Sequence, residues 1–473
     1  MPPMKAEAGG LSRRDALRAG ATALAGGAAT MAFGSSTSAL AFALQRTRAT
    51  IKDVQTMMMQ GGRTYTLVRI VADNGVYGIG EAYGSPGVSV ADQILAIKPR
   101  LVGKSPHDID VIYTNLDRGA PSLSGTRTDG SAHNLLRAAS GIDMALWDLS
   151  AKLLGVPISD LFGGRFRERV RMYRSTSPAN AWDKASCREW AQMIKEHPSG
   201  FTASKVGVFR TTSIWITALP EGRGRGAGPA GAAPGAAGAG RAGGGRAAPY
   251  LDPTRDTGNR HLTTMELRRI GQAFENMREA VGWEHDIMCH CHWEMDLASA
   301  IQLARVLEPV KPFFLEDPLM VDYNESWDRL MAASPVTIMM GENLARREGF
   351  RPFIVNQACH IINPDLRNSG GFLETKRIAD LASLYGISMC THNTASQVHT
   401  YQVAQWATTI RDYLMGETVT GTGSWMDEVV KLDAPYFEKG YIKASDKPGT
   451  GVELNKEVVV AHLAQGAQWW GDL

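Results

Sequence analysis

Five short apolar runs, spaced almost evenly along the second half of the chain, each lead to an ionisable side chain. These side chains are His292, Glu316, Glu342, Asp365 and His392, at intervals of 24, 26, 23 and 27 residues. One strand–helix unit of a parallel barrel has about this length, since eight units take about 250 residues. A single charge of this kind is usually solvated on a loop. Five in register predict a barrel whose mouth gathers acid, base and metal-binding groups.

The hydrophobic pattern of the second half of the chain differs from that of the first. From about residue 170 to 430, β-rich runs alternate with amphipathic helices such as ASAIQLARVLEPV, as in a parallel α/β sheet or barrel. Residues 46 to about 135 instead predict an α+β unit, because RTYTLVRIVADNGVYGIGEA alternates around a DNG turn. The segment AASGIDMALWDLSAKLLG has helical spacing and stops at Gly155 before Pro157.

Two further segments stand outside this pattern. Residues 1–44 contain LSRRDALRAG, with Arg13 and Arg14 before a Gly/Ala-rich stretch, which predicts a twin-arginine export signal cleaved near residues 41 to 43. The alternative is an Ala-rich tail with a chance arginine pair. Residues 221–249 are almost wholly Gly, Ala, Pro and Arg, and we expect a low-complexity, disordered insertion. A tolerated surface insertion, or a reading-frame error, explains this composition better than a flexible lid over the pocket.

Charge and hydropathy exclude some partners. The formal net charge of the 473 residues is +2, which gives no reason to expect nucleic acid. After the N-terminal segment, no run of 18 uninterrupted apolar residues occurs, so no membrane span is predicted. The sequence therefore predicts a globular protein that, if exported, works in the bacterial periplasm or beyond.

The stretch IMCHCHWEMD alternates cysteine and histidine, which raises the alternatives of a metal clasp and a redox pair. In a strand, His290 and His292 would face one way, and Cys289 and Cys291 the other. With the histidines at the barrel mouth, the cysteines would be small buried apolar residues against the helices. Five cysteines in the whole chain also do not suggest a disulfide framework.

Several motifs together resemble one family, from about residue 50 onward. GIDMALWDLSAKLLGVPISDLFGG, FFLEDPL, MMGENL, NPDLRNSGG and CTHNTAS are similar to the mandelate racemase branch of the enolase superfamily. Within it, the pattern resembles galactonate and mannonate dehydratases, because a histidine stands two residues after the first metal-ligand position. The resemblance implies an α/β fold in which residues 166–430 form a modified (β/α)7β barrel. Residues 45–165 would form an α+β capping domain, to which residues 431–473 return.

The resemblance also implies a divalent metal, usually Mg²⁺, that holds a substrate carboxylate while a base removes the α-proton. Glu316 and Glu342 fall at two ligand positions, the alternative being capping or surface carboxylates. His290 takes the ligand position where the family normally has Asp, so Mn²⁺, Fe²⁺ or Zn²⁺ is also possible. A hydrogen-bonding histidine beside two carboxylates is the alternative for His290.

Five residues are candidates for catalysis by the same resemblance: His392, Asp365, His292, Lys205 and Glu428. Asp365 would orient His392, and His292 would face His392 across the substrate. Lys205 occupies the first position of the family's Lys-x-Lys pair, whereas Gly207 occupies the second, so the usual lysine base is missing. Glu428 is the weakest candidate: the segment resembles the one that carries a late electrophilic glutamate in parts of the family, but a charge on a surface helix explains Glu428 better.

The resulting hypothesis is a metal-dependent dehydratase that converts an aldonate or aldarate into a 2-keto-3-deoxy acid. One alternative is a racemase, epimerase or cycloisomerase, since two histidines can return a proton to the opposite face. A second alternative is a non-catalytic protein that binds a sugar acid. The expected partners are a small carboxylate substrate and further copies of the chain in a homo-oligomer.

Overall fold

The computed structural model describes residues 49–84, 90–118, 133–208, 260–418 and 425–471. The predicted export signal (1–44) and the predicted insertion (221–249) lie outside these residues. Residues Ala49–Leu473 form one compact unit by their contacts. Within the described ranges, no helix combines the length and apolar character needed to cross a membrane.

The N-terminal part of this unit is a three-stranded antiparallel sheet covered by helices. Strands β1 (Ile51–Gln60), β2 (Thr64–Ala72) and β3 (Tyr77–Ala82) follow one another in order, with the expected turn at Asn74–Gly75 between β2 and β3. Helix α5 (His133–Leu154) packs closely on β3. A Cβ atom on Gly78 would come 2.1 Å from the carbonyl oxygen of Ala145, so glycine permits this approach. Helices α3 (Val90–Leu101) and α4 (Ile109–Arg118) complete this domain.

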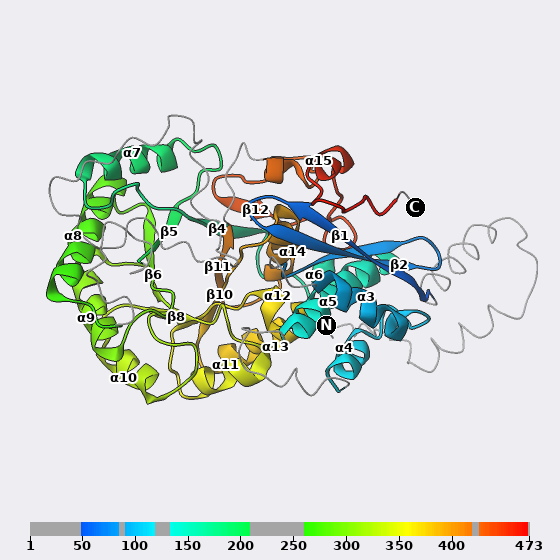
Figure 1. Ribbon diagram of the computed structural model, residues 1–473, viewed down its shortest axis with the longest axis horizontal. Helices are drawn as coiled ribbons and strands as arrows, with labels where there is room; N and C mark the ends of the chain where they lie inside the picture. The colour runs from blue at the N-terminus through cyan, green and yellow to red at the C-terminus, as the bar shows by residue number, and fades with distance from the viewer. Residues whose placement is uncertain (1–48, 85–89, 119–132, 209–259, 419–424, 472–473) are drawn as a thin grey trace, which may run out of the picture. The chain divides into compact units, whose positions relative to one another are not determined.

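Eight parallel strands form a closed barrel, because the last of them, β11, pairs with the first, β4 (Figure 1). The strands are β4 (Arg169–Ser175), β5 (Ala203–Gly207), β6 (Asp286–His290), β7 (Leu315–Glu316), β8 (Ile338–Met340), β9 (Ile361–Ile362), β10 (Ser388–Thr391) and β11 (Tyr413–Thr418). A ninth strand, β12 (Tyr441–Lys443), pairs antiparallel with β4. The prediction of a barrel with an N-terminal capping domain is confirmed.

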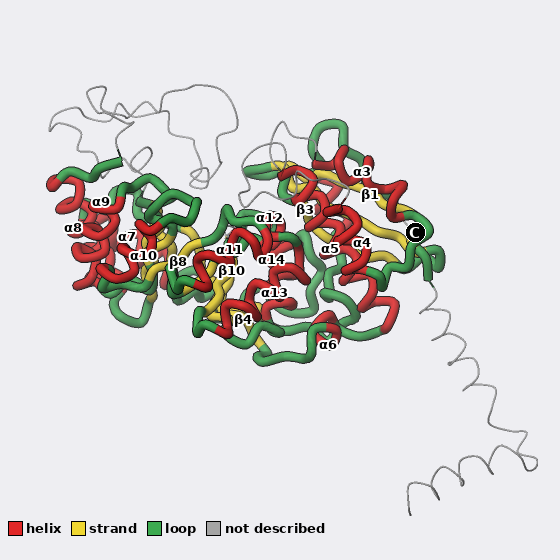
Figure 2. Tube along the Cα trace, turned by 90° about the horizontal axis from the view of Figure 1, so that it is seen from below, coloured by secondary structure: helices red, strands yellow, loops and turns green. Residues whose placement is uncertain are grey.

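Helices follow the strands around the outside of the barrel, as Figures 1 and 2 show for α8, α9 and α10. They are α7 (Lys184–Lys195), α8 (Thr264–Val281), α9 (Leu297–Leu307), α10 (Glu325–Ala333), α11 (Arg346–Val355), α13 (Gly371–Leu384) and α14 (Gln397–Ala407). Shorter elements are α6 (Ile158–Leu161), η2 (Glu308–Val310), α12 (Leu366–Ser369), η3 (Trp425–Glu428) and α15 (Lys456–Ala461). In the described chain after β11, η3 stands where a further barrel helix would, which is the (β/α)7β variant.

The barrel interior has two layers of different chemistry. The lower layer is a buried apolar cluster of Tyr173, Ala203, Met288, Phe314, Met339, Ile361, Cys390 and Met415. Side chains two residues further along a strand point to the same side. On β5, β6, β7 and β11 those residues are Lys205, His290, Glu316 and Glu417, all buried. The apolar layer thus forms the floor on which the polar groups converge.

Residues near the C-terminus add to the edge of the N-terminal sheet. The backbone N–H of Gln60 donates to His462 over 2.8 Å, and that of Ala464 donates to Met58 over 2.9 Å. Arg69 on β2 donates to the carbonyl oxygen of Gly471 over 3.0 Å. These contacts complete the capping domain with a segment from beyond the barrel. The domain boundaries at residues 165, 166, 430 and 431 stay predictions.

Candidate active site

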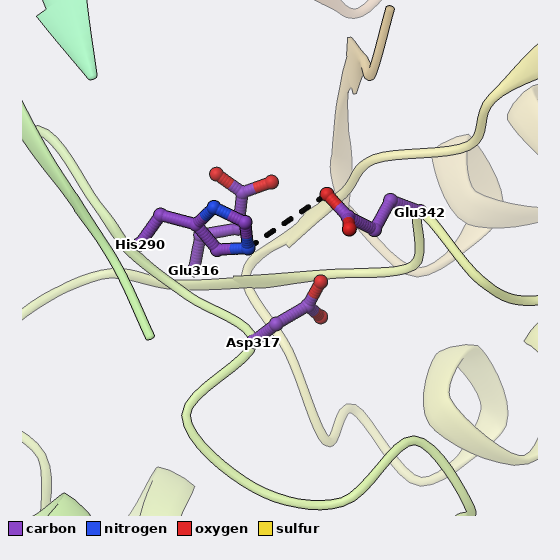
Figure 3. A group of neighbouring side chains, drawn as sticks. All are labelled: His290, Glu316, Asp317 and Glu342. Atoms are coloured by element: carbon purple, nitrogen blue, oxygen red, sulfur yellow. Dashed lines mark ion pairs between the residues drawn. The ribbon is translucent and has the colours of Figure 1, made fainter. Parts of the chain in front are cut away.

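Four side chains at the barrel mouth could hold a metal ion: His290, Glu316, Asp317 and Glu342 (Figure 3). One ligand atom from each lies within 4.8 Å of the others, and all four residues are buried. Strand pairing explains the convergence, since His290 is opposite Glu316 in the register of β6 and β7. The structure therefore brings together all three predicted ligands and adds Asp317.

The chemistry of this group fits a divalent cation. Burial raises the pKa of Glu316 to about 8, and it raises the pKa of Asp317 well above its usual range. Asp317 Oδ1 accepts from the Gly341 N–H over 3.3 Å, while buried Oδ2 has no hydrogen-bond partner among the described residues. Burial also lowers the pKa of His290, which favours the neutral imidazole that metal binding requires. A divalent cation would compensate the three clustered carboxylates.

Asp317 was not predicted as a ligand, because only one acid was expected at the end of each strand. The adjacent acid in FFLEDP was the available signal. Asp317 has a left-handed φ of 46°, so the chain turns directly after β7. In a continued strand, Asp317 would point to the opposite side from Glu316. The turn instead brings both side chains to the same site.

Lys205 supplies a fixed positive charge beside this cluster. Its Nζ lies 2.9 Å from Glu316 Oε2 and 2.9 Å from Glu417 Oε1. Although burial opposes the charged form, Glu316 and Glu417 raise the pKa of Lys205 above its usual value. Asn363 Nδ2, at the end of β9, also donates to Glu316 Oε1 over 2.7 Å. Lys205 thus lies at the pocket as a buried, paired lysine.

A late glutamate at the barrel mouth was predicted at Glu428, but the structure has Glu417 there instead. Glu417 is buried on β11 and accepts from the Asn393 N–H over 3.2 Å. Glu428 is exposed on η3, and none of the ion pairs described for the mouth involves it. The regular spacing contained a signal for the right residue, because Glu417 lies 25 residues after His392. Asn363 had no comparable signal.

Asp365 and His392 form a hydrogen-bonded pair at the ends of neighbouring strands. His392 Nδ1 lies 3.0 Å from Asp365 Oδ2, and Asp365 also accepts two hydrogen bonds from the Arg367 guanidinium, over 3.0 and 2.7 Å. Despite its burial, Arg367 and His392 hold the pKa of Asp365 well below its usual range. This carboxylate therefore stays ionised and fixes the ring orientation of His392.

The second ring nitrogen of His392 faces the metal-binding group. Nε2 lies 3.3 Å from Glu342 Oε2 and 3.9 Å from Glu417 Oε2. Burial alone would lower the pKa of His392, but Glu342 and Asp365 raise it to about 10. The dyad predicted from the sequence is therefore assembled next to the predicted ligands. Nε2 is the atom placed to exchange a proton with a bound molecule.

His292 does not follow the strand alternation that the sequence analysis assumed. Strand β6 ends at His290, and His292 and Trp293 have left-handed φ angles of 54° and 59°. His292 is exposed, with its ring centre 5.5 Å from that of His290. The prediction that β6 extends through His292 is wrong, because the chain turns there. The structure still places His292 beside the metal-binding group.

The cysteines of the same stretch behave as expected. Cys289 and Cys291 are fully buried in the apolar cluster between barrel and helices, and all five cysteines are free thiols. Burial raises the pKa of the Cys291 thiol well above its usual value, which disfavours the thiolate needed for redox or metal chemistry.

These features define a class of protein: a capped barrel with buried carboxylates and a histidine–aspartate dyad at the ends of its strands. Two family models match. One, "Mandelate racemase / muconate lactonizing enzyme, N-terminal domain", covers residues 41–163, and the other, "Enolase C-terminal domain-like", covers residues 189–458. The chain belongs to the mandelate racemase/muconate lactonizing enzyme family of the enolase superfamily.

Its curated relatives include several named sugar-acid dehydratases. The chain is 33% identical to a D-xylonate dehydratase of Haloferax volcanii over 422 residues, which are 88% of this chain and 90% of the relative. It is 28% identical to a D-mannonate dehydratase of Novosphingobium aromaticivorans, covering 86% and 96%. A crystal structure of a mandelate racemase/muconate lactonizing enzyme-like protein from Rubrobacter xylanophilus has a TM-score of 0.73 at 27% identity, covering 89% of this chain and 100% of that one.

Proposed function

We propose that this protein is a sugar-acid dehydratase, which removes the proton α to a carboxylate and expels the 3-hydroxyl group to give a 2-keto-3-deoxy acid. The observation that carries the proposal is the position of the Asp365–His392 dyad: the second ring nitrogen of His392 lies 3.3 Å from Glu342 of the metal-binding group. Several relatives are named dehydratases of aldonates. A pure binding protein has little use for an oriented acid/base group, so the dyad favours an enzyme.

His290, Glu316 and Glu342, with Asp317 beside them, would hold a divalent cation. When bound, such a cation stabilises the negative charge that develops on a carboxylate as its α-proton leaves. Lys205 adds a permanent positive charge next to Glu316. Mg²⁺ suits the carboxylate ligands, while the imidazole of His290 favours Mn²⁺, Fe²⁺ or Zn²⁺.

The chain's own residues would move the protons. Asp365 holds the Nδ1 side of His392, so Nε2 is left to take or give a proton. His292, exposed beside His290, is the second candidate. One of the two histidines would remove the α-proton, and the other would protonate the departing hydroxyl group. Glu428 has no place in this mechanism, and Glu417 would instead hold Lys205 in position.

Proton NMR in D₂O tests the proposal on the purified protein with Mg²⁺ or Mn²⁺ and a panel of aldonic and aldaric acids. We expect one acid to disappear as a 2-keto-3-deoxy product grows. Incorporation of α-deuterium or a stereoisomeric product without loss of water would replace dehydration by epimerisation. No turnover of any acid by a metal-loaded protein would count against catalysis on this substrate class.

A His392→Asn variant extends the same test. It should lower turnover by about 10² to 10⁴-fold, the usual contribution of a general acid or base, while metal stays bound. The matched control is His261→Asn, since His261 is exposed and pairs with Asp296. Full activity of His392→Asn would rule out the acid/base assignment.

We further propose export to the bacterial periplasm and assembly into a homo-oligomer. The first rests on the Arg13–Arg14 pair ahead of an apolar stretch, the second on the family resemblance. Fractionation of cells, with Arg13 and Arg14 changed to lysine as the comparison, tests export. Light scattering of the purified protein tests assembly.

A further inference from the structure

A second polar cluster lies beside the dyad and takes no part in the proposed chemistry. Arg63, in the turn between β1 and β2, donates from Nη1 to Tyr83 Oη over 3.3 Å and to Thr394 Oγ1 over 3.1 Å. Tyr83 follows β3 of the capping domain, while Thr394 lies on the barrel loop after β10. All three side chains are half-buried. The cluster therefore joins cap and barrel where the loop carrying His392 begins.

Hydrogen bonds connect this cluster to the dyad. Arg367 Nη2 donates to Thr394 Oγ1 over 3.2 Å and to Asp365 Oδ2 over 2.7 Å. Asp365 Oδ2 is also the atom bonded to His392. Arg63 is thus linked to the dyad through the Thr394 hydroxyl group and the Arg367 guanidinium group. A sugar acid held by one end at the metal-binding group could place its other end near the cluster.

The cluster carries much positive charge. The guanidinium groups of Arg137 and Arg367 lie 4.5 and 4.6 Å from the centre of the Tyr83 ring, so with Arg63 three arginines surround one tyrosine. Arg367 is paired with Asp365 and lies 3.7 Å from Glu81. Within the described part of the chain, the hydrogen bonds of Arg63 go to two neutral hydroxyl oxygens.

Arg63 is therefore suited to an anion. A guanidinium group has five N–H donors, and both hydrogen bonds of Arg63 use Nη1, leaving Nε and Nη2 available as a fork. Such a fork matches the two oxygens of a carboxylate. A partly desolvated cation also gains more from a charged partner than from a hydroxyl group.

We propose that Arg63, Tyr83 and Thr394 form a subsite for a second carboxylate at the far end of the substrate. The preferred substrates are then aldarates, which have a carboxylate at both ends, over aldonates, which end in a hydroxymethyl group. This inference rests on the proposed function for the reaction at the first carboxylate. It separates this chain from the relatives whose names specify aldonates.

The test compares acid pairs that differ only at the far end: D-glucarate with D-gluconate, galactarate with D-galactonate, and xylarate with D-xylonate. The enzymes are the Mg²⁺-loaded wild type, Arg63→Met and Arg63→Lys. Arg100→Met is the matched control, because Arg100 is an exposed capping-domain arginine on α3. The measured quantity is kcat/KM for each acid.

For at least one pair, we expect wild type to favour the aldarate. Arg63→Met should lower kcat/KM for that aldarate by about ten- to a hundredfold, the worth of a charge-assisted hydrogen bond, with much less effect on its aldonate. Arg63→Lys should restore part of the loss, and Arg100→Met should change neither value. Wild-type preference for the aldonate in every pair, or an equal loss on both acids in Arg63→Met, would overturn the proposal.

Calorimetry separates this proposal from the proposed function. The same acids are titrated into Mg²⁺-loaded His392→Asn protein, with and without Arg63→Met. If no acid is turned over by wild type, yet aldarates bind more tightly in a manner that depends on Arg63, the dehydratase function fails and the subsite stands. If aldarates bind no more tightly than aldonates, the subsite fails whatever the turnover.

Discussion

Lys205 is a buried cation among the carboxylates of the site. It is almost fully buried between Glu316 and Glu417, 2.9 Å from each, and it lies near the carboxylates that would hold a metal ion. A buried ion pair adds modestly to stability, but loss of one partner leaves an uncompensated charge, which is costly. Lys205 and a metal ion would therefore share the task of neutralising the same acids.

Lys205→Met should lower the free energy of unfolding of the metal-free protein by about 3–5 kcal/mol, because Glu316 and Glu417 lose their buried cation. Urea titration measures the change, and added Mg²⁺ should recover part of it. The control is Lys431→Met, since Lys431 forms an exposed pair with Glu453 over 3.5 Å, which should cost about 1 kcal/mol or less. Equal effects of the two substitutions would contradict the buried pairing.

His290→Asp should tighten the binding of Mg²⁺ relative to Zn²⁺, since a carboxylate is a harder, charged ligand than imidazole. Calorimetric titration of both ions gives the two affinities. His292→Asp is the control, because His292 lies two residues away but outside the four-residue metal-binding group. Unchanged affinities in His290→Asp would show that His290 is not a ligand.

Among the secondary-structure elements, helices α5 and α13 make a notable contact between cap and barrel. Asp143 of α5 accepts a hydrogen bond from the Phe372 N–H over 2.6 Å, in the first turn of α13. Gly371 has a φ of 83°, and a Cβ atom there would come 2.3 Å from Asp143 Oδ2. Position 371 therefore requires glycine, because the Asp143 carboxyl group contacts the first residues of α13 there.

Asp143→Asn should make stability less dependent on pH. Burial raises the pKa of Asp143 to about 8, so the folded state binds a proton more strongly than the unfolded state. The contribution of this residue is thus greatest at low pH and is lost as pH rises from about 4 to about 8. Between pH 5 and 8, wild type should lose about 1–3 kcal/mol more than Asp143→Asn in urea unfolding. Parallel stability curves would show that Asp143 is not responsible.

The sequence predicted some of these elements well because strand spacing and polar strand ends are local patterns. Glu316, Glu342 and Asp365 mark the ends of β7, β8 and β9 in this way. It could not predict that β6 stops before His292, since that depends on two left-handed φ angles. Nor could it pair Lys205 with Glu417, because closure of the barrel brings those residues together across 212 positions.

At the scale of the whole molecule, the low-complexity segment of residues 221–249 can be removed to test whether stability and activity depend on it. In the sequence it comes between β5 and α8. Surface insertions of this kind are tolerated, because the entropy of closing a loop grows slowly with its length.

Deletion of residues 222–247 should leave the unfolding midpoint and the turnover nearly unchanged. Circular dichroism and the NMR assay measure the two quantities. A deletion of matched size is not available elsewhere without removing core residues, so replacement of the segment by a Gly/Ser linker of equal length serves as the control. A large loss of activity in both proteins would show that these residues act as a lid over the pocket.

The pairing of β1 with the segment around residues 462–464 has a consequence for how the protein is made. Arg69 and Gly471, which this pairing brings into contact, are 402 residues apart in the chain. During synthesis, β1 to β3 emerge first, and β1 remains an open sheet edge bearing Met57, Met58 and Met59. Its partner segment leaves the ribosome only after the last barrel strand. A nascent chain therefore carries an unpaired strand edge, prone to aggregation, while the barrel folds, and the capping domain is the last part to be completed.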